Sequence, residues 1–180
     1  MIAMQSSGLH SNGYSLVRHV LLEQGKRSLE EHVDDLGRTL GEELLEPTRI
    51  YAKACLELAR ETETHAMSHV TGGGLAANLE RVLPDSVVAV LDRGTWTPPP
   101  VFDLVRRVGA VAQPDLERTL NCGVGMVAVL PPDEVDRAIG LLAERGLSAW
   151  VCGEVSGAGS GAGAPAGGSV TLTGSHPGWS

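Results

Sequence analysis

The stretch HAMSHVTGGGLAANLERV, residues 65–82, contains a strand pattern, a glycine loop and a helix pattern in immediate succession. Apolar and polar residues alternate from 65 to 70, which is typical of a half-buried strand, and Leu75, Leu79 and Val82 then recur at helical spacing. The three glycines between them allow backbone N–H groups to approach an anion, and the positive end of the helix dipole favours negative charge there. The stretch therefore predicts either a phosphate-binding loop or an ordinary tight turn.

The first 25 residues repeat this order. The apolar run MIAM, residues 1–4, is typical of a strand, and Tyr14, Val17 and Val20 fall at helical spacing before a break near Gly25. The open loop SSGLHSNG lies between them. Ligands of α/β sheets gather at the strand ends where helices start, so we expect the two loops to lie together and to form one anion-binding pocket.

The rest of the chain continues the alternation of strands and helices. Strands are predicted at 87–91 and 125–131. One helix is predicted to open at 47–48 with Ile50, Ala54 and Leu58 on one face, and two more are predicted after 98–100 and over 131–145. The segments 149–155 and 169–174 are predicted to form a closing hairpin. The Gly/Ala-rich connection 156–168 has few side chains to form contacts and is expected to be mobile. The charged segment 26–46 is predicted to lie at the surface with a short amphipathic turn. These patterns predict one α+β or α/β domain over 1–174 and a tail at 175–180.

The composition argues against several classes of partner. The 180 residues carry a net charge of −8 and a pI near 5.2, so the basic surface of a nucleic-acid-binding protein is lacking. No apolar run approaches the roughly 20 residues that cross a bilayer, and the start of the chain lacks signal-peptide features, so we expect no membrane association and a cytoplasmic location. Scattered cysteines predict neither a disulfide nor a zinc site, and the acids between 30 and 35 are interpreted as a solvated helical face.

Several polar side chains lie in or near the loops. An imidazole beside a phosphate-binding loop can donate to phosphate oxygens or move a proton near neutral pH, so His10 and His69 are predicted to be catalytic. Arg49 is predicted either to bind a phosphate or carboxylate, or to form a surface ion pair. Asn121 is interpreted as a ligand-binding residue or as a turn residue. The remaining histidines are interpreted as structural: His19, His32, His65 and His176.

Four strings carry a resemblance to a known family. They are SSGLHSNGYSLVR at 6–18, LLEPTRIY at 44–51, HVTGGGLAANLERVLP at 69–84 and LNCGVGMVAVLP at 120–131. In this order and at these separations they resemble the C-terminal domain of phosphoribosylformylglycinamidine cyclo-ligase, the aminoimidazole ribonucleotide synthetase of purine biosynthesis. The resemblance extends from Met1 to about Val155. Selenophosphate synthetase and thiamine monophosphate kinase share the architecture, but HSNGYSLVR and PTRIY favour the cyclo-ligase.

The resemblance implies a fold, a reaction and a set of site residues. The fold is a layered α/β/α domain with a mixed sheet flanked by helices. In the reaction ATP, accompanied by Mg²⁺, phosphorylates the formyl oxygen of formylglycinamidine ribonucleotide, an amidine nitrogen attacks that carbon, and phosphate leaves as the ring closes. Carried over by position, one wall of the substrate cleft would consist of Ser7, Gly8, His10, Ser11, Asn12 and Gly13, and the other of His69, Thr71, Gly72, Gly73 and Gly74. Arg49 and Asn121 are added as substrate-binding or phosphate-binding candidates from their own chemistry.

The chain departs from the family in one respect. The family's enzyme also has an N-terminal domain, which carries most ATP and metal contacts and forms the homodimer, and nothing in this sequence corresponds to it. One hypothesis is therefore a substrate-binding half of a cyclo-ligase that works with an N-terminal domain in cis or in trans. The alternative is a non-catalytic domain of the same fold that binds a phosphorylated metabolite or pairs with another protein.

Overall fold

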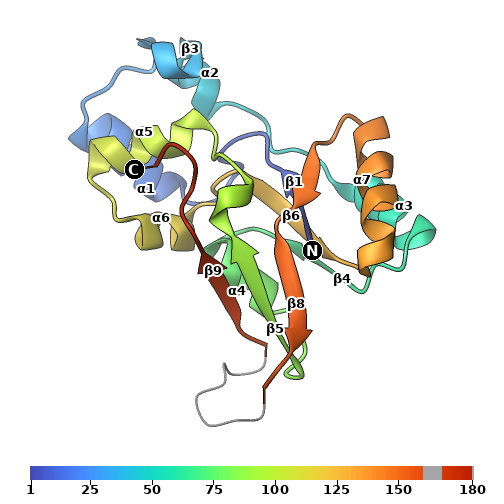
Figure 1. Cartoon of the computed structure of the whole chain (residues 1–180). Coiled ribbons are helices and arrows are strands. Elements are labelled where there is room, and N and C mark those ends of the chain that lie inside the picture. The colour runs from blue at the N-terminus through green and yellow to red at the C-terminus, as the bar shows by residue number, and fades with distance from the viewer. Residues whose placement is uncertain (160–167, 180) are drawn as a thin grey trace.

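A computed structural model describes residues 1–159 and 168–179 of the chain (Figure 1). The strands are β1 (Ile2–Gln5), β2 (His32–Val33), β3 (Arg38–Thr39), β4 (Ala66–His69), β5 (Val87–Asp92), β6 (Val124–Val129), β7 (Ala149–Val151), β8 (Gly153–Gly157) and β9 (Val170–Thr173). The α-helices are α1 (Tyr14–Arg18), α2 (Leu40–Leu44), α3 (Ala52–Glu61), α4 (Gly74–Glu80), α5 (Pro100–Gly109), α6 (Gln113–Thr119) and α7 (Val135–Glu144). The stretch 156–168, predicted to be mobile, lies mostly outside the described residues.

A four-stranded sheet in the order β4-β6-β1-β7 forms the centre of the fold, and every neighbouring pair in it is antiparallel. Alternate residues of β1 point to opposite faces. Ile2 and Met4 pack with residues of α3 and α7, whereas Met1 and Ala3 pack with residues of α4 and β5. The predicted layered α+β class is confirmed, because helices cover one face of this sheet and a helix with a second sheet covers the other (Figure 1).

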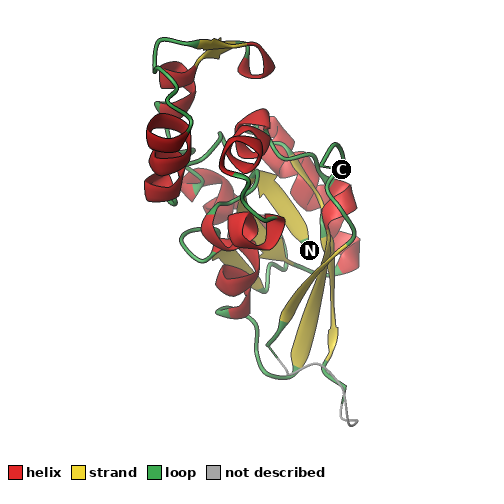
Figure 2. Cartoon of the chain, turned by 90° about the vertical axis from the view of Figure 1, so that its left-hand side faces the viewer, coloured by secondary structure: helices red, strands yellow, loops and turns green. Residues whose placement is uncertain are grey.

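A second sheet has the order β8-β5-β9 and projects at one end of the molecule, opposite β2, β3 and α2 (Figure 2). β5 pairs antiparallel with β8 and parallel with β9, so this is the mixed sheet. The predicted closing hairpin is therefore wrong. Its first strand is divided into β7, which pairs with β1, and β8, and the strands β8 and β9 flank β5 without pairing with each other.

The helix predictions have mixed outcomes. Those after 98–100 and over 131–145 are confirmed as α5 and α7. The first helix is α-helical only to Arg18 and continues as a π-helix over His19–Gln24. The helix predicted at 47–48 begins instead at Ala52, and Ile50 is 87% exposed. Its start is displaced because backbone groups at 47 and 49 hydrogen-bond to the first loop.

Four other findings complete the fold. α6 was not predicted, and the surface segment 26–46 holds the hairpin β2–β3 and α2, whose capping box is formed by Thr39 and Glu42. The segment after β9, predicted as a tail, packs on the core through the buried His176 and Trp179. No helix among the described residues has the length and apolar character needed to cross a bilayer.

Candidate functional site

The two loops meet at one end of the central sheet. β1 and β4 both pair antiparallel with β6, which lies between them, so they run in the same direction and end at the same edge. The loop after β1 and the loop after β4 are therefore neighbours. Asn12 Oδ1 lies 3.8 Å from the position a Cβ would take at Gly72, and the ring centroids of His10 and His69 are 6.5 Å apart.

Tyr51 supplies a third ring between the loops. Its centroid lies 5.9 Å from that of His10 and 6.2 Å from that of His69, and its hydroxyl donates to the carbonyl of Gln5 at 2.8 Å. The rings cover Gly125, where a Cβ would lie 2.9 Å from His10 Cε1 and would overlap the Tyr51 hydroxyl. Sequence reasoning missed Tyr51, although a tyrosine next to PTRI in a chain with 3% aromatic residues was a usable signal.

His10 is held as a neutral imidazole. It is 5% exposed, and Nε2 accepts from the Ser7 N–H at 3.3 Å, so the ring proton is assigned to Nδ1. Nδ1 is buried and has no partner among the described residues. Burial, with His69 and Arg49 as further causes, lowers the pKa of His10 to about 4. Of the two roles predicted for His10, these surroundings favour donation of a hydrogen bond over transfer of a proton near neutral pH.

Two serines of the first loop bind the segment before α3. The Ser7 hydroxyl donates to the Pro47 carbonyl at 2.6 Å and accepts from the Arg49 N–H at 3.1 Å. The hydroxyls of Ser11 and Thr48 are 3.0 Å apart. Both serines were predicted to bind ligand. In the structure their hydroxyls form hydrogen bonds between the first loop and the motif LLEPTRIY.

The side chain of Asn121 supports the first loop through hydrogen bonds. Its Nδ2 donates to the carbonyls of Gly8 at 2.9 Å and Leu9 at 3.1 Å, and its Oδ1 accepts from the Ser6 hydroxyl at 3.0 Å and the Gly123 N–H at 2.8 Å. The side chain is 4% exposed. Because both donors and both acceptor positions of the amide are used, none is left for a ligand. These contacts favour the turn-residue interpretation of Asn121, in which the side chain supports the first loop.

The glycine loop is held from inside by Asn78, which sequence reasoning also missed. Its Nδ2 donates to the carbonyls of Gly74 at 2.7 Å and of Thr71 and Gly72 at 3.3 Å, and Oδ1 accepts from the Thr71 hydroxyl at 2.9 Å. Gly72 and Gly73 are exposed, with Gly73 at φ +101°. With the carbonyls turned inward, the exposed backbone of these two glycines is what the loop presents to a ligand.

Two predicted ligand-binding glycines are required for packing. A Cβ at Gly74 would overlap the carbonyl oxygen of Glu117, and a Cβ at Gly13 would overlap Leu120 and lie 3.0 Å from the Thr119 carbonyl oxygen. Both have a positive φ, +76° and +77°. α4 and α1 also have only seven and five residues, so their dipoles contribute little to anion binding.

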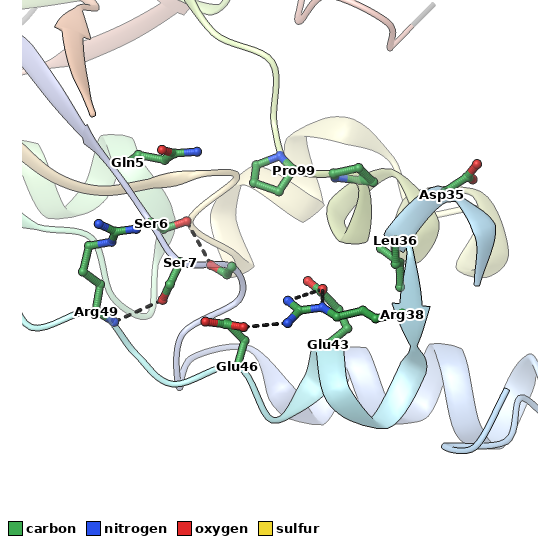
Figure 3. Close-up of a pocket in the computed structure, with 12 residues that line it drawn as sticks. Gln5, Ser6, Ser7, Asp35, Leu36, Arg38, Glu43, Glu46, Arg49 and Pro99 are labelled. Carbon is green, nitrogen blue, oxygen red and sulfur yellow. Dashed lines mark hydrogen bonds and ion pairs between the residues drawn. The ribbon is translucent and has the colours of Figure 1, made fainter. Parts of the chain in front are cut away.

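A cleft of about 400 Å³ opens beside the first loop (Figure 3). It is lined by Ser7, Gly8 and Arg49 on one side and by Arg38, Glu43 and Glu46 on the other. Arg38 pairs with Glu43 and Glu46, each at 2.6 Å. Arg49 forms no ion pair within residues 1–159 and 168–179, and its Nε is buried without a partner. The surface-ion-pair interpretation of Arg49 is therefore wrong, and a cation remains for an anionic ligand.

The loops do not enclose a single pocket. Gly8 lines the cleft described above, whereas Gly73 lines a separate hollow of about 290 Å³ between α4 and α6. The rings of His10, Tyr51 and His69 lie between the loops. The prediction of neighbouring loops is thus confirmed, and each loop lines a hollow of its own. Within the described part of the chain no three His, Cys, Asp or Glu side chains are grouped so that they could hold a metal ion.

Known proteins match this chain along most of its length. The family described as AIR synthase related protein, C-terminal domain, matches residues 1–164. A putative phosphoribosylformylglycinamidine cyclo-ligase of Streptomyces fradiae is 58% identical over 98% of this chain and 96% of that protein. The phosphoribosylformylglycinamidine cyclo-ligase of Symbiobacterium thermophilum is 47% identical over 88% of this chain. The chain spans only 46% of that longer protein.

A solved structure shows the same fold at low identity. Thiamine-monophosphate kinase from Stenotrophomonas maltophilia K279a superposes with a TM-score of 0.59 at 20% identity, over 98% of this chain and 51% of that one. At this identity the likeness concerns the fold alone. The match over 1–164 and the 58% identity over nearly the whole chain together show that the chain belongs to the family of AIR synthase related protein C-terminal domains.

Proposed function

We propose that this chain is the substrate-binding half of an ATP-dependent cyclo-ligase that converts formylglycinamidine ribonucleotide to aminoimidazole ribonucleotide. ATP phosphorylates the formyl oxygen, an amidine nitrogen attacks the formyl carbon, and phosphate leaves as the C–N bond closes the ring. The observation that carries the proposal is the meeting of the two motif loops at His10 and His69. The names of the relatives supply the reaction.

The residues around the two loops are proposed to have different roles, according to their surroundings. The backbone of Gly72 and Gly73 and the guanidinium of Arg49 are proposed to hold anionic groups of the ribonucleotide. Arg49 forms no ion pair within the described residues, its Nε has no partner there, and its Nη1 donates to the Gly146 carbonyl at 3.5 Å. His10, neutral and fixed, is proposed to donate a hydrogen bond to a ligand oxygen. His69 is exposed on β4 and is the imidazole to which we assign proton transfer.

The other half of the site is proposed to come from an N-terminal domain, in cis or in trans. Longer relatives carry more than twice the length matched here, and the described residues hold no metal ligand set, so ATP and Mg²⁺ contacts are assigned to that domain. Leu45 and Ile50, 81% and 87% exposed, lie before and after Arg49 in the motif LLEPTRIY, which lines the rim of the cleft through Glu46 and Arg49. We propose that this rim contacts the N-terminal domain. We also propose that the full-length protein forms the homodimer of its family and that it is located in the cytoplasm.

Reconstitution tests the proposal. The chain is mixed with the separately produced N-terminal half of the Symbiobacterium thermophilum cyclo-ligase, and release of phosphate from ATP is followed with formation of aminoimidazole ribonucleotide. We expect turnover in the mixture and none in either half alone. His69→Asn keeps a donor but removes proton transfer near neutral pH, so it should lower kcat more than substrate affinity. Association of the halves and binding of the ribonucleotide without any turnover would favour the non-catalytic alternative.

A further inference from the structure

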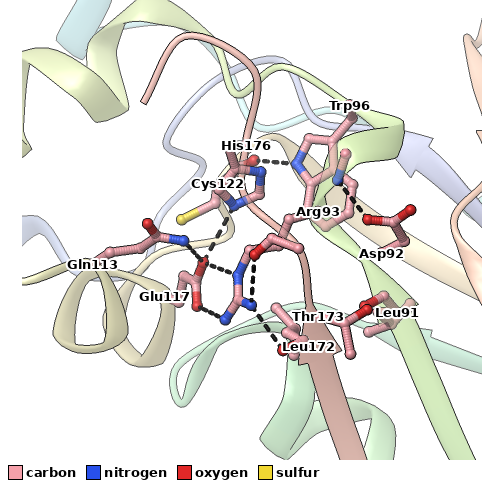
Figure 4. Close-up of polar contacts among 12 residues, drawn as sticks. Leu91, Asp92, Arg93, Trp96, Gln113, Glu117, Cys122, Leu172, Thr173 and His176 are labelled. Atoms are coloured by element: carbon pink, nitrogen blue, oxygen red, sulfur yellow. Dashed lines mark hydrogen bonds and ion pairs between the residues drawn. The ribbon is translucent and has the colours of Figure 1, made fainter. Parts of the chain in front are cut away.

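A buried polar network surrounds Glu117 of α6, the residue against whose backbone Gly74 of the glycine loop packs (Figure 4). Arg93 donates to both carboxylate oxygens, from Nε to Oε1 and from Nη2 to Oε2, each at 2.7 Å, and Gln113 Nε2 donates to Oε1 at 2.8 Å. The Arg93 and Glu117 side chains are 16% and 11% exposed. Burial raises the pKa of Glu117, but hydrogen bonds from Arg93, His176 and Gln113 outweigh it and lower the pKa to about 2. The carboxylate is thus ionised and fixed in orientation.

The same network holds the C-terminal segment. Arg93 Nη1 donates to the carbonyl of Leu172 at 2.7 Å, and His176 Nε2 lies 3.2 Å from the central carboxylate. The ring of His176 is fully buried between Trp96 and Trp179, with centroids 4.7 and 4.8 Å away in edge-on contacts. Residues 168–179 lie beyond the stretch that matches the family. They are nevertheless joined to α6 by the hydrogen bond between His176 and Glu117.

The backbone at Glu117 is in turn the surface on which the glycine loop rests. A Cβ at Gly74 would overlap the Glu117 carbonyl oxygen and would lie 2.8 Å from its carbonyl carbon and 3.1 Å from the Cα of Arg118. Asn78 holds the loop carbonyls from the inside. The loop is therefore clamped between Asn78 of its own helix and the backbone of α6. A shift of α6 at this residue changes where Gly72 and Gly73 point.

We propose that Glu117 is a positioning residue for the glycine loop: its carboxylate, held by Arg93 and His176, fixes the carbonyl against which Gly74 packs, and thereby the direction of the Gly72 and Gly73 N–H groups. The identity of the ligand that these groups meet rests on the proposed function. The support of the loop does not. Through His176, the C-terminal segment is part of that support.

The test replaces the carboxylate without changing its shape. Glu117→Gln keeps the volume but removes the charge that Arg93 and His176 hold. The control is Asp103→Asn on α5, which likewise removes a carboxylate paired with arginines, Arg106 at 2.8 Å and Arg107 at 2.6 Å, but does not contact the loop. In ¹H–¹⁵N spectra of the full chain, we expect the Gly72 and Gly73 amide resonances to move in the first variant and to stay in the control.

Two further measurements keep the test decisive. His176→Phe retains the aromatic contacts with both tryptophans but removes the hydrogen bond to Glu117, so it should move the same two resonances and serves if Glu117→Gln does not fold. Affinity for formylglycinamidine ribonucleotide should fall by about tenfold in Glu117→Gln, the scale on which lost outer-shell hydrogen bonds weaken binding at metal sites. Folded variants with unmoved Gly72 and Gly73 resonances would overturn the proposal. Moved resonances in a chain that binds no ribonucleotide would leave the positioning intact and count against the proposed function.

Discussion

Replacing each of two adjacent glycines by alanine separates ligand contact from packing in the glycine loop. Gly73 and Gly74 both have a positive φ, +101° and +76°, so alanine is strained at either position. Around a Cβ at Gly73 the nearest atoms lie 3.6–3.8 Å away, which is ordinary van der Waals contact. A Cβ at Gly74 would instead overlap the Glu117 carbonyl. The two substitutions thus share their backbone strain and differ in one steric contact.

The magnitudes follow from these two causes. Strain of this kind costs about 1–3 kcal/mol at each position. Gly74→Ala adds the cost of moving α6 away from α4, about 1–3 kcal/mol by comparison with overpacked cores. We therefore expect a total of about 2–6 kcal/mol for Gly74→Ala, against about 1–3 kcal/mol for Gly73→Ala. In a protein of this size each kcal/mol lowers Tm by about 2–4 °C.

Urea unfolding followed by tryptophan fluorescence measures the free energies, and calorimetric titration with formylglycinamidine ribonucleotide measures affinity. Gly73→Ala should remain folded and lose affinity, because its Cβ blocks close approach of a phosphate to the loop backbone. Equal losses of stability at the two positions would refute the steric argument. A folded Gly73→Ala variant with wild-type affinity would remove Gly73 from the ligand contacts.

Three further outcomes are expected. Asn121→Ala should lower the free energy of unfolding by about 2–4 kcal/mol, because it leaves several buried groups without partners, whereas Asn12→Ala, which loses no hydrogen bond within the described residues, should stay within about 0.5 kcal/mol in the same urea titrations. The pKa of His10 falls from 6.5 to about 4 on folding, so between these values the unfolded chain binds a proton that the folded chain does not. Stability should therefore decrease as the pH falls from about 6.5 to about 4, by about 2–3 kcal/mol from this group, and a His10→Gln variant with the same acid sensitivity as wild type would contradict this. The substitutions Leu45→Ser and Ile50→Ser should leave Tm unchanged but lower the turnover reconstituted with the N-terminal half. Undiminished turnover would exclude this rim as the contact surface for the N-terminal domain.

The sequence predicted the two loops well and some of their residues poorly. Strand, glycine loop and helix succeed one another directly within the stretch 65–82, and such local patterns can be recognised from periodicity alone. The helix predicted at 47–48 failed because Ser7, 40 positions away from Pro47, competes for the backbone groups that would begin it. Periodicity contains no information about such a distant partner.

The sequence by itself determined the family, the layered α+β class and the neighbouring places of the two motif loops, because these depend on local residue order and on strand direction. Only the tertiary structure decided that β8 and β9 flank β5, that His10 is neutral, and that the Asn121 amide donates a hydrogen bond to the carbonyl of Gly8, 113 positions away. The physical reason is common to all three. Pairing, burial and the satisfaction of a buried amide are properties of contacts between distant segments, and those contacts exist only once the chain has folded.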